Sequence, residues 1–201
     1  MFSILPDPVQ NLCARAQGGD IAAASELIAL FYKKIFSYFR RQCASDEDAQ
    51  DLTQKCFCKI WVSLKSFRGR STFSTWIHGV AYHVYVDWRR RKNVADLKAD
   101  EWWETCAAEA AGPFEAAAEK EASGQLYRLV QELDDDVQAV VHLHYYQGLS
   151  LRETAQALNI ATSTVKYRLR NALKFLKAKI ENESRVRPAN IPGDTYERSP
   201  N

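Results

Sequence analysis

The sequence of 201 residues lacks the usual marks of a secreted, membrane-spanning or catalytic protein. No apolar run is long enough to cross a bilayer, and residues 1–13 hold prolines and an acid where a signal peptide would need basic residues and an apolar stretch. No glycine-rich phosphate loop and no HExxH or GxSxG motif occurs. We therefore expect a cytoplasmic protein that is not an enzyme and that needs no cofactor.

Five cysteines, an odd number without the spacing of a small disulfide-rich domain, are typical of a reducing compartment. Cys56 and Cys58 invite a metal-site interpretation. Residues two apart on a helix project about 200° from each other, however, so the two thiolates cannot easily bind one ion. A similar objection applies to the histidine pairs His142 with His144 and His78 with His83. A thiol or metal sensor stays open as an alternative that would bind zinc or respond to thiol oxidation.

Net charge is only +2, yet the charges alternate in blocks along the chain. Residues 1–93 carry 14 basic and 8 acidic side chains, a net charge of +6, whereas residues 94–125 carry 2 basic and 8 acidic ones, a net charge of −6. Residues 150–179 return to +6, with 7 basic and 1 acidic side chain. Because a local basic face attracts phosphate more than the whole-molecule charge does, the pattern favours a nucleic-acid partner.

Helical periodicity recurs along the chain and strand signals are scarce, which predicts an all-α protein. The hydrophobic content of 46% supports one or two modest cores, and Asp20 is a good N-cap for a long helix ending near Arg41. We expect two small helical domains joined by an acidic linker, with a flexible tail. Their expected bounds are 8–93 for the first domain, 94–123 for the linker, 124–183 for the second domain and 184–201 for the tail.

The linker differs from its surroundings in composition as well as in charge. It is rich in alanine and is interrupted by Gly112-Pro113, which a continuous helix tolerates poorly. Trp102 and Trp103 are unusual in a solvated tether. They either anchor the linker on a domain or partner, or belong to a short amphipathic helix.

The stretch 48–92 predicts a helix, a short basic turn and an aromatic helix with a cationic end. The first helix has an apolar stripe, and the second begins after an N-cap at Ser71 or Thr72. The first stripe comprises Ala49, Leu52, Cys56, Phe57, Ile60, Trp61 and Leu64. The second helix buries Phe73, Trp76, Ile77, Val80, Ala81, Val84 and Trp88.

The turn between these helices, Phe67-Arg68-Gly69-Arg70-Ser71, carries groups suited to single-stranded nucleic acid. Its glycine allows close approach of the backbone to a ligand, while arginines, an aromatic ring and a hydroxyl offer phosphate, stacking and hydrogen-bonding contacts. In a second interpretation, Phe67 and Phe73 only pin a tight turn and the arginines are solvated.

The chain after residue 124 has the pattern of a helix-turn-helix. Gly148 ends one helix, Ser150-Leu151-Arg152-Glu153 forms a capping box for a short helix through Leu158, and a turn at residues 159–161 leads into a longer helix. That last helix is expected to bury Val165, Leu169, Ala172, Leu173 and Leu176. Its first turns would enter a major groove, although a merely solvated basic helix is the alternative.

Two motifs resemble the bacterial extracytoplasmic-function sigma factors. DAQDLTQKCFCKIW and FRGRSTFSTWI resemble DAxDLxQxxFxxxW and FRGxSxFxTWL of the second conserved sigma region, and GLSLRETAQALNIATSTVKYRLRNAL resembles the helix-turn-helix of the fourth. The resemblance implies a subunit that binds RNA polymerase core at the clamp helices and flap, and recognises promoter DNA. It also implies an anti-sigma partner.

Residue roles follow from the same resemblance, position by position. For polymerase binding it implies Asp48, Asp51, Leu52, Gln54, Lys55 and Cys58, with Phe57 and Trp61 either in contact or in the core. For melting and the minus-ten element it implies Phe67, Arg68, Gly69, Arg70, Ser71, Phe73, His83, Arg89, Arg90, Arg91 and Lys92, with Trp76 bracing the turn from inside. For the minus-thirty-five element it implies Ser163, Thr164, Lys166, Tyr167, Arg168, Arg170, Asn171 and Lys174.

The chain departs from the family pattern in three places. Residues 79–83, Gly-Val-Ala-Tyr-His, stand where the family often has Arg-Ile-Ala-Arg-Asn, so the choice of base can differ. Ala161 replaces a frequent capping serine, and Asp134 replaces a common proline. A free-standing helix-turn-helix regulator that binds DNA as a dimer is the alternative to a sigma factor.

Overall fold

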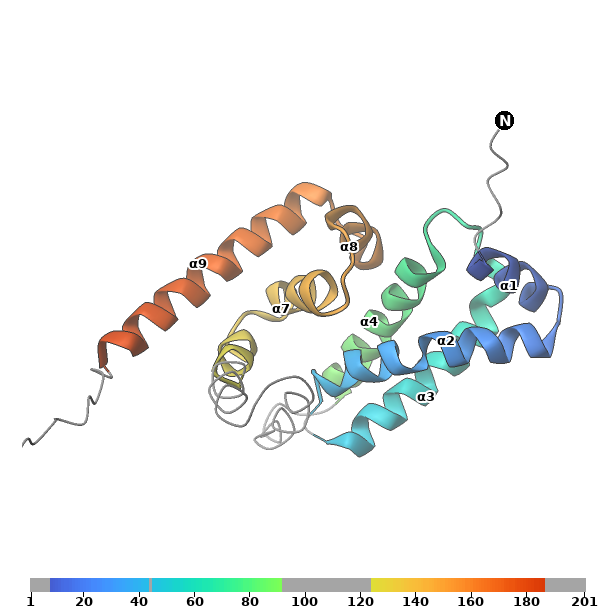
Figure 1. Ribbon diagram of the computed structural model, residues 1–201, viewed down its shortest axis with the longest axis horizontal. Helices are drawn as coiled ribbons and strands as arrows, with labels where there is room; N and C mark the ends of the chain where they lie inside the picture. Colours follow the sequence, from blue (N-terminus) through green and yellow to red (C-terminus); the bar gives the residue numbers. More distant parts are fainter. Residues whose placement is uncertain (1–7, 44, 92–123, 187–201) are drawn as a thin grey trace, which may run out of the picture.

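The computed structural model describes residues 8–43, 45–91 and 124–186, and its regular elements are all helical, as expected (Figure 1). The N-terminal group comprises α1 (Pro8–Gln17), α2 (Ile21–Arg40), α3 (Asp46–Ser63), the 3-10 turn η1 (Leu64–Ser66) and α4 (Phe73–Arg91). The C-terminal group comprises a helix at 124–131, α7 (Asp135–Val141), the π-helical η3 (His142–Tyr146), α8 (Leu151–Leu158) and α9 (Thr162–Val186). The linker with Trp102 and Trp103, Lys92 and the chain beyond residue 186 lie outside the described residues.

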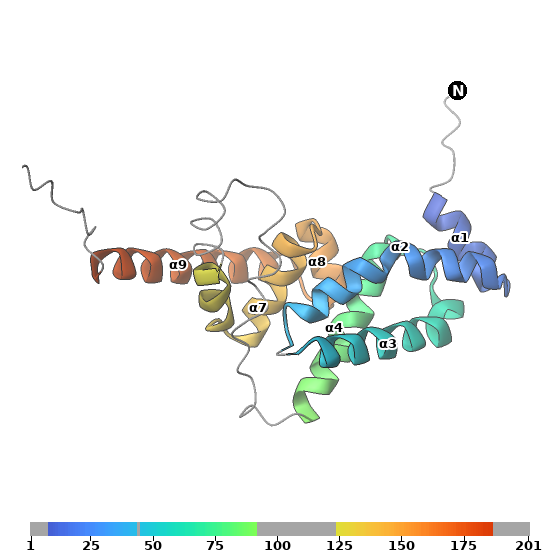
Figure 2. The ribbon, with the colours of Figure 1, turned by 60° about the horizontal axis from the view of Figure 1, so that its bottom comes forward.

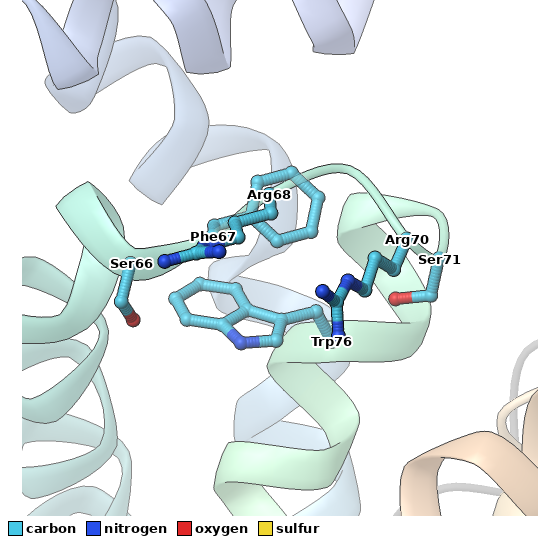
Figure 3. Close-up of a pocket in the computed structure, with 6 residues that line it drawn as sticks. All are labelled: Ser66, Phe67, Arg68, Arg70, Ser71 and Trp76. Carbon is cyan, nitrogen blue, oxygen red and sulfur yellow. The ribbon is translucent and has the colours of Figure 1, made fainter.

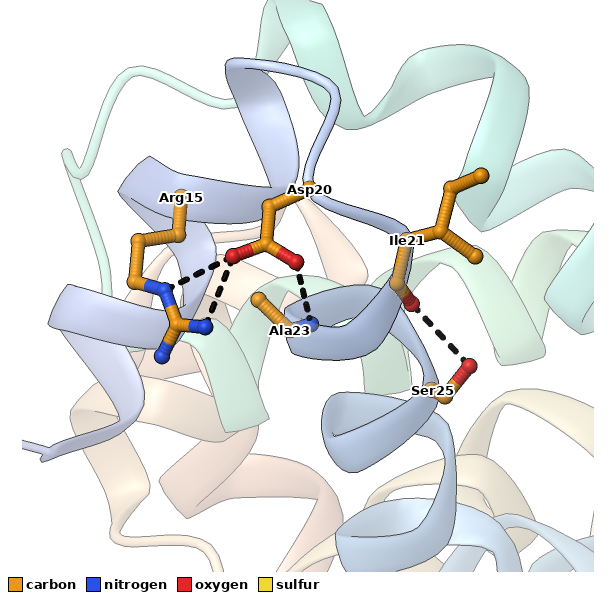
Figure 4. A network of polar contacts seen from close by, with 5 residues as sticks. All are labelled: Arg15, Asp20, Ile21, Ala23 and Ser25. Carbon is orange, nitrogen blue, oxygen red and sulfur yellow. Dashed lines mark hydrogen bonds and ion pairs between the residues drawn. The ribbon is translucent and has the colours of Figure 1, made fainter.

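The start of α2 confirms Asp20 as an N-cap and ties α1 to α2 (Figure 4). One carboxylate oxygen of Asp20 accepts from the Ala23 amide at 3.1 Å, and the other accepts from Arg15 Nε and Nη2 at 2.9 and 2.7 Å. One turn on, the Ser25 hydroxyl donates to the Ile21 carbonyl at 3.0 Å. The amide and then the guanidinium hold the pKa of the Asp20 carboxyl below its usual value, because both stabilise the carboxylate.

The core of the N-terminal group forms where α2, α3 and α4 pack together. Ile35, Tyr38, Phe39, Leu52 and Ile77 are its largest fully buried apolar side chains. The apolar stripe predicted for α3 is confirmed for most of its members, since Ala49, Leu52, Cys56, Ile60 and Leu64 are buried. It was wrong for Trp61, whose side chain is 49% exposed.

The C-terminal group has its own buried centre at Val130, Val140, Leu143 and Val165. The prediction that α9 buries Leu173 is wrong, because this side chain is 53% exposed. Helix α9 also continues to Val186, past the residue at which we expected the tail to begin. No helix among the described residues is both long and apolar enough to span a bilayer.

The two groups pack against each other, mainly through α4 and α8 (Figures 1 and 2). The helix at 124–131 adds a second contact, because the Tyr127 hydroxyl donates to the Arg41 carbonyl at 2.9 Å. Arg41 in turn lies over the ring of Tyr146, 4.7 Å from its centroid. The sequence did not predict this interface, since nothing in a local pattern marks contacts between distant helices.

Candidate nucleic-acid interface

The turn between α3 and α4 is held from both sides. Gly69 has a φ of +66°, in the left-handed region that favours glycine. From α1, the Gln17 side-chain amide donates to the carbonyls of Leu64 at 3.0 Å and Phe67 at 2.7 Å. Sequence reasoning missed Gln17, because a hydrogen bond spanning about 50 residues leaves no local pattern. At the other end, the Thr72 hydroxyl accepts from the Thr75 amide at 3.1 Å, which confirms the predicted start of α4.

Three aromatic rings form the base of this turn. Phe67 and Trp76 have centroids 5.1 Å apart, and Phe73 lies 5.6 Å from each of them. The structure places Phe73 in the core, with 4% of its surface exposed, and its contact with a base stays a prediction. Phe67 is only partly buried and lines a pocket.

A pocket of about 300 Å³ opens beside these rings (Figure 3). Figure 3 shows the Trp76 indole beneath the turn with the Arg70 side chain alongside it. Trp76 was expected only to brace the turn, yet it forms part of the pocket wall, as does Ser66, which no motif singled out. The pocket is lined by Ser66, Phe67, Arg68, Arg70, Ser71 and Trp76. The aromatic wall and two exposed guanidinium groups suit a flat ring attached to a phosphate.

The basic end of α4 lies farther along the same helix. Arg90 and Arg91 are exposed, as is His83, whereas the Arg89 side chain is 24% exposed. Arg89 Nη2 lies 2.6 Å from Asp135 Oδ1 at the start of α7. Of the three arginines that end α4, Arg89 is thus engaged by an acid of the C-terminal group, and Arg90 and Arg91 are exposed.

The helix-turn-helix forms as its capping pattern predicts. The Ser150 hydroxyl accepts from the Glu153 amide at 3.2 Å and the Glu153 carboxylate accepts from the Ser150 amide at 2.9 Å. These bonds lower the pKa of the Glu153 carboxyl. Asn159 ends α8 in the left-handed conformation, with φ of 53°, and Ala161 precedes α9 without a side-chain oxygen to cap it. Asn159 thus caps the C-terminus of α8, whereas Ala161 offers no side-chain cap to the N-terminus of α9.

Most residues predicted to read duplex DNA lie on the open face of α9. Tyr167 is 62% exposed, and Arg168 differs from its neighbours because its side chain is 20% exposed and ion-paired with Asp136 of α7. The exposed members are Ser163, Lys166, Tyr167, Arg170 and Lys174, and the half-buried ones are Thr164 and Asn171. The structure thus presents a basic face with one arginine already engaged.

A groove of about 470 Å³ runs between α3 and α4 and is lined partly by Gln54, Lys55 and Cys58. Asp51 is exposed next to it and lies 3.4 Å from Lys55. Asp48 is half-buried at the start of α3. Leu52 is 1% exposed and packs in the core, and its contact with a partner stays a prediction.

The thiols and imidazoles do not assemble into a metal site in the part of the chain that the structure describes, where no group of three potential ligands occurs. Burial raises the pKa of the Cys56 thiol to about 12, which keeps it protonated at neutral pH. Cys58 is exposed on α3, as its place off the apolar stripe predicted.

Two family models match the chain, in the order that the motifs suggested. Residues 27–94 match sigma-70 region 2 and residues 123–176 match sigma-70 region 4, together more than half of the chain. The sigma factor SigW of Bacillus subtilis (strain 168) is 26% identical over 182 residues, which cover 87% of this chain and 97% of that protein. The sigma-E factor of Escherichia coli (strain K12) is 28% identical over 180 residues, or 86% and 94% of the two chains.

Known structures have a similar fold. CnrH, in its complex with the cytosolic domain of CnrY, superimposes with a TM-score of 0.67 at 21% identity, over 89% of this chain and all of that one. RpoE of Bartonella quintana, in its complex with the anti-sigma factor NepR, gives 0.59 at 16% identity, over 78% and 96% of the two chains. With both regions matched in order, the chain belongs to the extracytoplasmic-function sigma factors of the sigma-70 family, non-enzymatic proteins that direct promoter recognition by RNA polymerase.

Proposed function

We propose that this sigma factor traps one unstacked base of the minus-ten element in the pocket between α3 and α4. The pocket supports this proposal because it combines an aromatic wall, at Phe67 and Trp76, with the exposed cations Arg68 and Arg70. Unstacking a base costs a few kcal/mol, and base–aromatic stacking returns about 1–3 kcal/mol of it. Arg90 and Arg91, with Lys92 outside the described residues, would bind the neighbouring phosphates.

The same proposal assigns duplex reading at the minus-thirty-five element to α9. In a helix-turn-helix, the first turns of the second helix contact base edges and later turns meet the backbone. We therefore assign base contacts to Lys166 and Arg170 and a phosphate contact to Lys174, with Ser163, Thr164, Tyr167 and Asn171 alongside. Arg168 instead orients the helix through its ion pair with Asp136.

Polymerase binding is assigned to the exposed part of α3 that faces away from the core. Asp51, Gln54, Lys55 and Cys58 support this because they lie together beside the α3–α4 groove. Trp61 extends the same helix with a half-exposed ring, and large aromatic side chains are common binding hot spots. Residues 8–93 and 124–183 would then act as two domains on one polymerase in the cytoplasm, joined by the linker.

An anti-sigma partner is also part of the proposal, since both structural neighbours described above were solved with a second protein bound, in one case a named anti-sigma factor. Within residues 8–43, 45–91 and 124–186, no feature favours the free-standing dimeric regulator. The observation that carries the proposal is the presence, in one chain, of a cation-flanked aromatic pocket and a separate basic recognition helix.

Transcription in vitro tests the proposed function. Purified core enzyme, fragmented genomic DNA and the full chain should yield transcripts with defined starts that core alone does not produce. Charge reversal at the pocket, Arg70→Glu, should abolish those transcripts while leaving core binding intact. Specific transcripts that persist unchanged with Arg70→Glu would contradict the assignment of the pocket.

A further inference from the structure

The turn between α3 and α4 has few backbone hydrogen bonds of its own. The Phe67 amide donates to the Leu64 carbonyl at 3.0 Å, and the Thr72 carbonyl accepts from the Trp76 amide at 3.1 Å. Between these two points, the amides of residues 68–71 donate to no backbone carbonyl among the described residues. A segment with few hydrogen bonds changes conformation at low cost, so contacts from other helices decide how well it keeps one conformation.

Gln17, the last residue of α1, makes such a contact. Its side-chain amide carries two hydrogens, and it donates to the carbonyls of Leu64 at 3.0 Å and Phe67 at 2.7 Å. The Phe67 carbonyl belongs to the peptide group that leads directly into Arg68. The bond from Gln17 therefore fixes the peptide that joins the aromatic wall of the pocket to its first cation.

The end of α1 that carries Gln17 is itself held in place. Ala16, the preceding residue, is 5% exposed and packs in the core. Arg15 binds the Asp20 carboxylate, which also caps α2 (Figure 4). Helix α1 precedes the residues 27–94 that match sigma-70 region 2, so the family motifs do not mark this contact.

The peptide group after Phe67 affects two sides of the pocket at once. The Phe67 ring lies 5.1 Å from the Trp76 ring, centroid to centroid, and the Arg68 side chain lines the same pocket. Rotation of this peptide would move the ring and the guanidinium group relative to α4. A binding site that must first be ordered returns less binding free energy, so a turn held in advance captures a base more tightly.

We infer that Gln17 is a positioning residue for base capture, which holds the Phe67 carbonyl from α1 and so pre-organises the aromatic wall and Arg68. The inference rests on the proposed function in taking this pocket as the site of capture. Gln17 is not among the residues that line the pocket, so it acts through the turn and not on the base.

Replacement of the side-chain amide tests this role. Gln17→Met keeps a long side chain with high helix propensity and removes both donors. Gln10→Met makes the same change at an exposed position of the same helix and is the matched control. Holoenzyme with Gln17→Met should bind a minus-ten non-template oligonucleotide about three- to tenfold more weakly than holoenzyme with Gln10→Met, the equivalent of about one hydrogen bond. Equal affinity of these two holoenzymes would overturn the inference.

Oligonucleotides with an abasic site separate positioning from a general loss of stability. The abasic site is placed at each position of the minus-ten element in turn, and the captured base is the one whose removal weakens binding to the parent holoenzyme most. At that position Gln17→Met should cost little further affinity, because no base is left to stack. A loss as large as with the intact oligonucleotide would show that Gln17 only stabilises the domain, and would overturn the inference.

Gln17→Glu gives a readout that a purely structural role would not change. A carboxylate cannot donate to the Leu64 and Phe67 carbonyls, whereas a protonated carboxyl group donates one hydrogen bond. Partial burial next to two carbonyl oxygens raises the pKa of such a carboxyl, so oligonucleotide binding relative to the parent should recover as the pH falls from about 8 to about 5.5. Gln10→Glu should show no recovery. A ratio of Gln17→Glu to parent affinity that does not change with pH would contradict the inference.

A failure of this inference differs from a failure of the proposed function. If the pocket captures a base but Gln17 does not position the turn, one abasic position weakens binding to the parent, while Gln17→Met binds like Gln10→Met. If the pocket captures no base, no abasic position stands out in the parent, and specific transcripts persist with Arg70→Glu.

Discussion

The rings of Phe67 and Trp76 lie with their centroids 5.1 Å apart and their planes tilted by 40° across the turn that precedes α4. One ring belongs to the turn and the other to the first turns of a well-capped helix, so the pocket wall is rigid on the side that α4 provides. The other side depends on Gln17, which holds the Phe67 carbonyl from α1.

Removing the indole should weaken capture of the minus-ten strand. Trp76→Ala deletes part of the stacking wall, and loss of about 1–3 kcal/mol would weaken binding of a minus-ten non-template oligonucleotide to holoenzyme about 5- to 150-fold. Fluorescence anisotropy measures this directly. Tyr145→Ala, which removes an exposed ring from the C-terminal group, is the control and should bind normally. Equal affinity of the two variants for the oligonucleotide would exclude the pocket as the site that captures the minus-ten strand.

Two neighbours on α3 should behave in opposite ways. Asp51→Lys changes an exposed side chain, so it should leave the free energy of unfolding within about 0.5 kcal/mol and weaken core-enzyme binding about tenfold or more. Leu52→Ala should cost about 2–5 kcal/mol of stability, because it leaves a cavity in the core. Denaturant unfolding and a core-binding titration separate the two effects. Glu26→Lys on α2 is the charge-reversal control, and a loss of core binding as large as that of Asp51→Lys would contradict the assignment.

The basic face of α9 should divide into base and phosphate contacts. Arg170→Ala should cost about 1–3 kcal/mol and relax preference at one position, whereas Lys174→Ala should weaken all sequences alike and reduce the salt slope by about 1. Binding titrations over a series of promoter variants and salt concentrations distinguish them. If Arg170→Ala weakens binding to all promoter variants equally, Arg170 contacts a phosphate and not a base.

The sequence predicted the structure best where the interactions that fix it join residues close together in the chain. Asp20, Thr72 and Ser150 start helices as expected, because a capping side chain bonds to amides two or three residues away. Leu173 and Trp61 were misplaced, since each lies at the edge of a wide apolar stripe and periodicity alone does not say where the core ends.

Long-range contacts were the least predictable part of the site. The Gln17 bond to the turn and the packing of α4 on α8 join residues far apart in the chain, and neither has a sequence signature of its own. Gly79 was visible only as a departure from the family pattern. Its reason, the close approach of Ala157, is visible only in the folded chain.

Acid should destabilise the C-terminal group through His142. This side chain is 1% exposed, neither ring nitrogen has a hydrogen-bond partner among the described residues, and burial lowers the pKa of His142 to about 3. Between pH 6.5 and about 3 the His142 imidazole is therefore protonated in the unfolded chain and neutral in the folded chain. The free energy of unfolding should fall as the pH drops through this range.

His142→Phe should flatten that pH dependence in urea unfolding followed at several pH values. His83→Phe, which replaces an exposed imidazole of α4, is the control and should keep it. A parent-like slope in the His142→Phe chain would show that other groups govern acid stability.

Photo-crosslinking in the open complex tests most directly the claim that one chain captures the minus-ten strand and reads the minus-thirty-five duplex. A photoreactive phenylalanine derivative is placed at Arg68 in one chain and at Tyr167 in another, each assembled with core enzyme on an active promoter. We predict that position 68 crosslinks to the non-template strand near minus ten and position 167 to duplex near minus thirty-five. Crosslinks from both positions to one DNA segment, or from neither to DNA, would contradict the account.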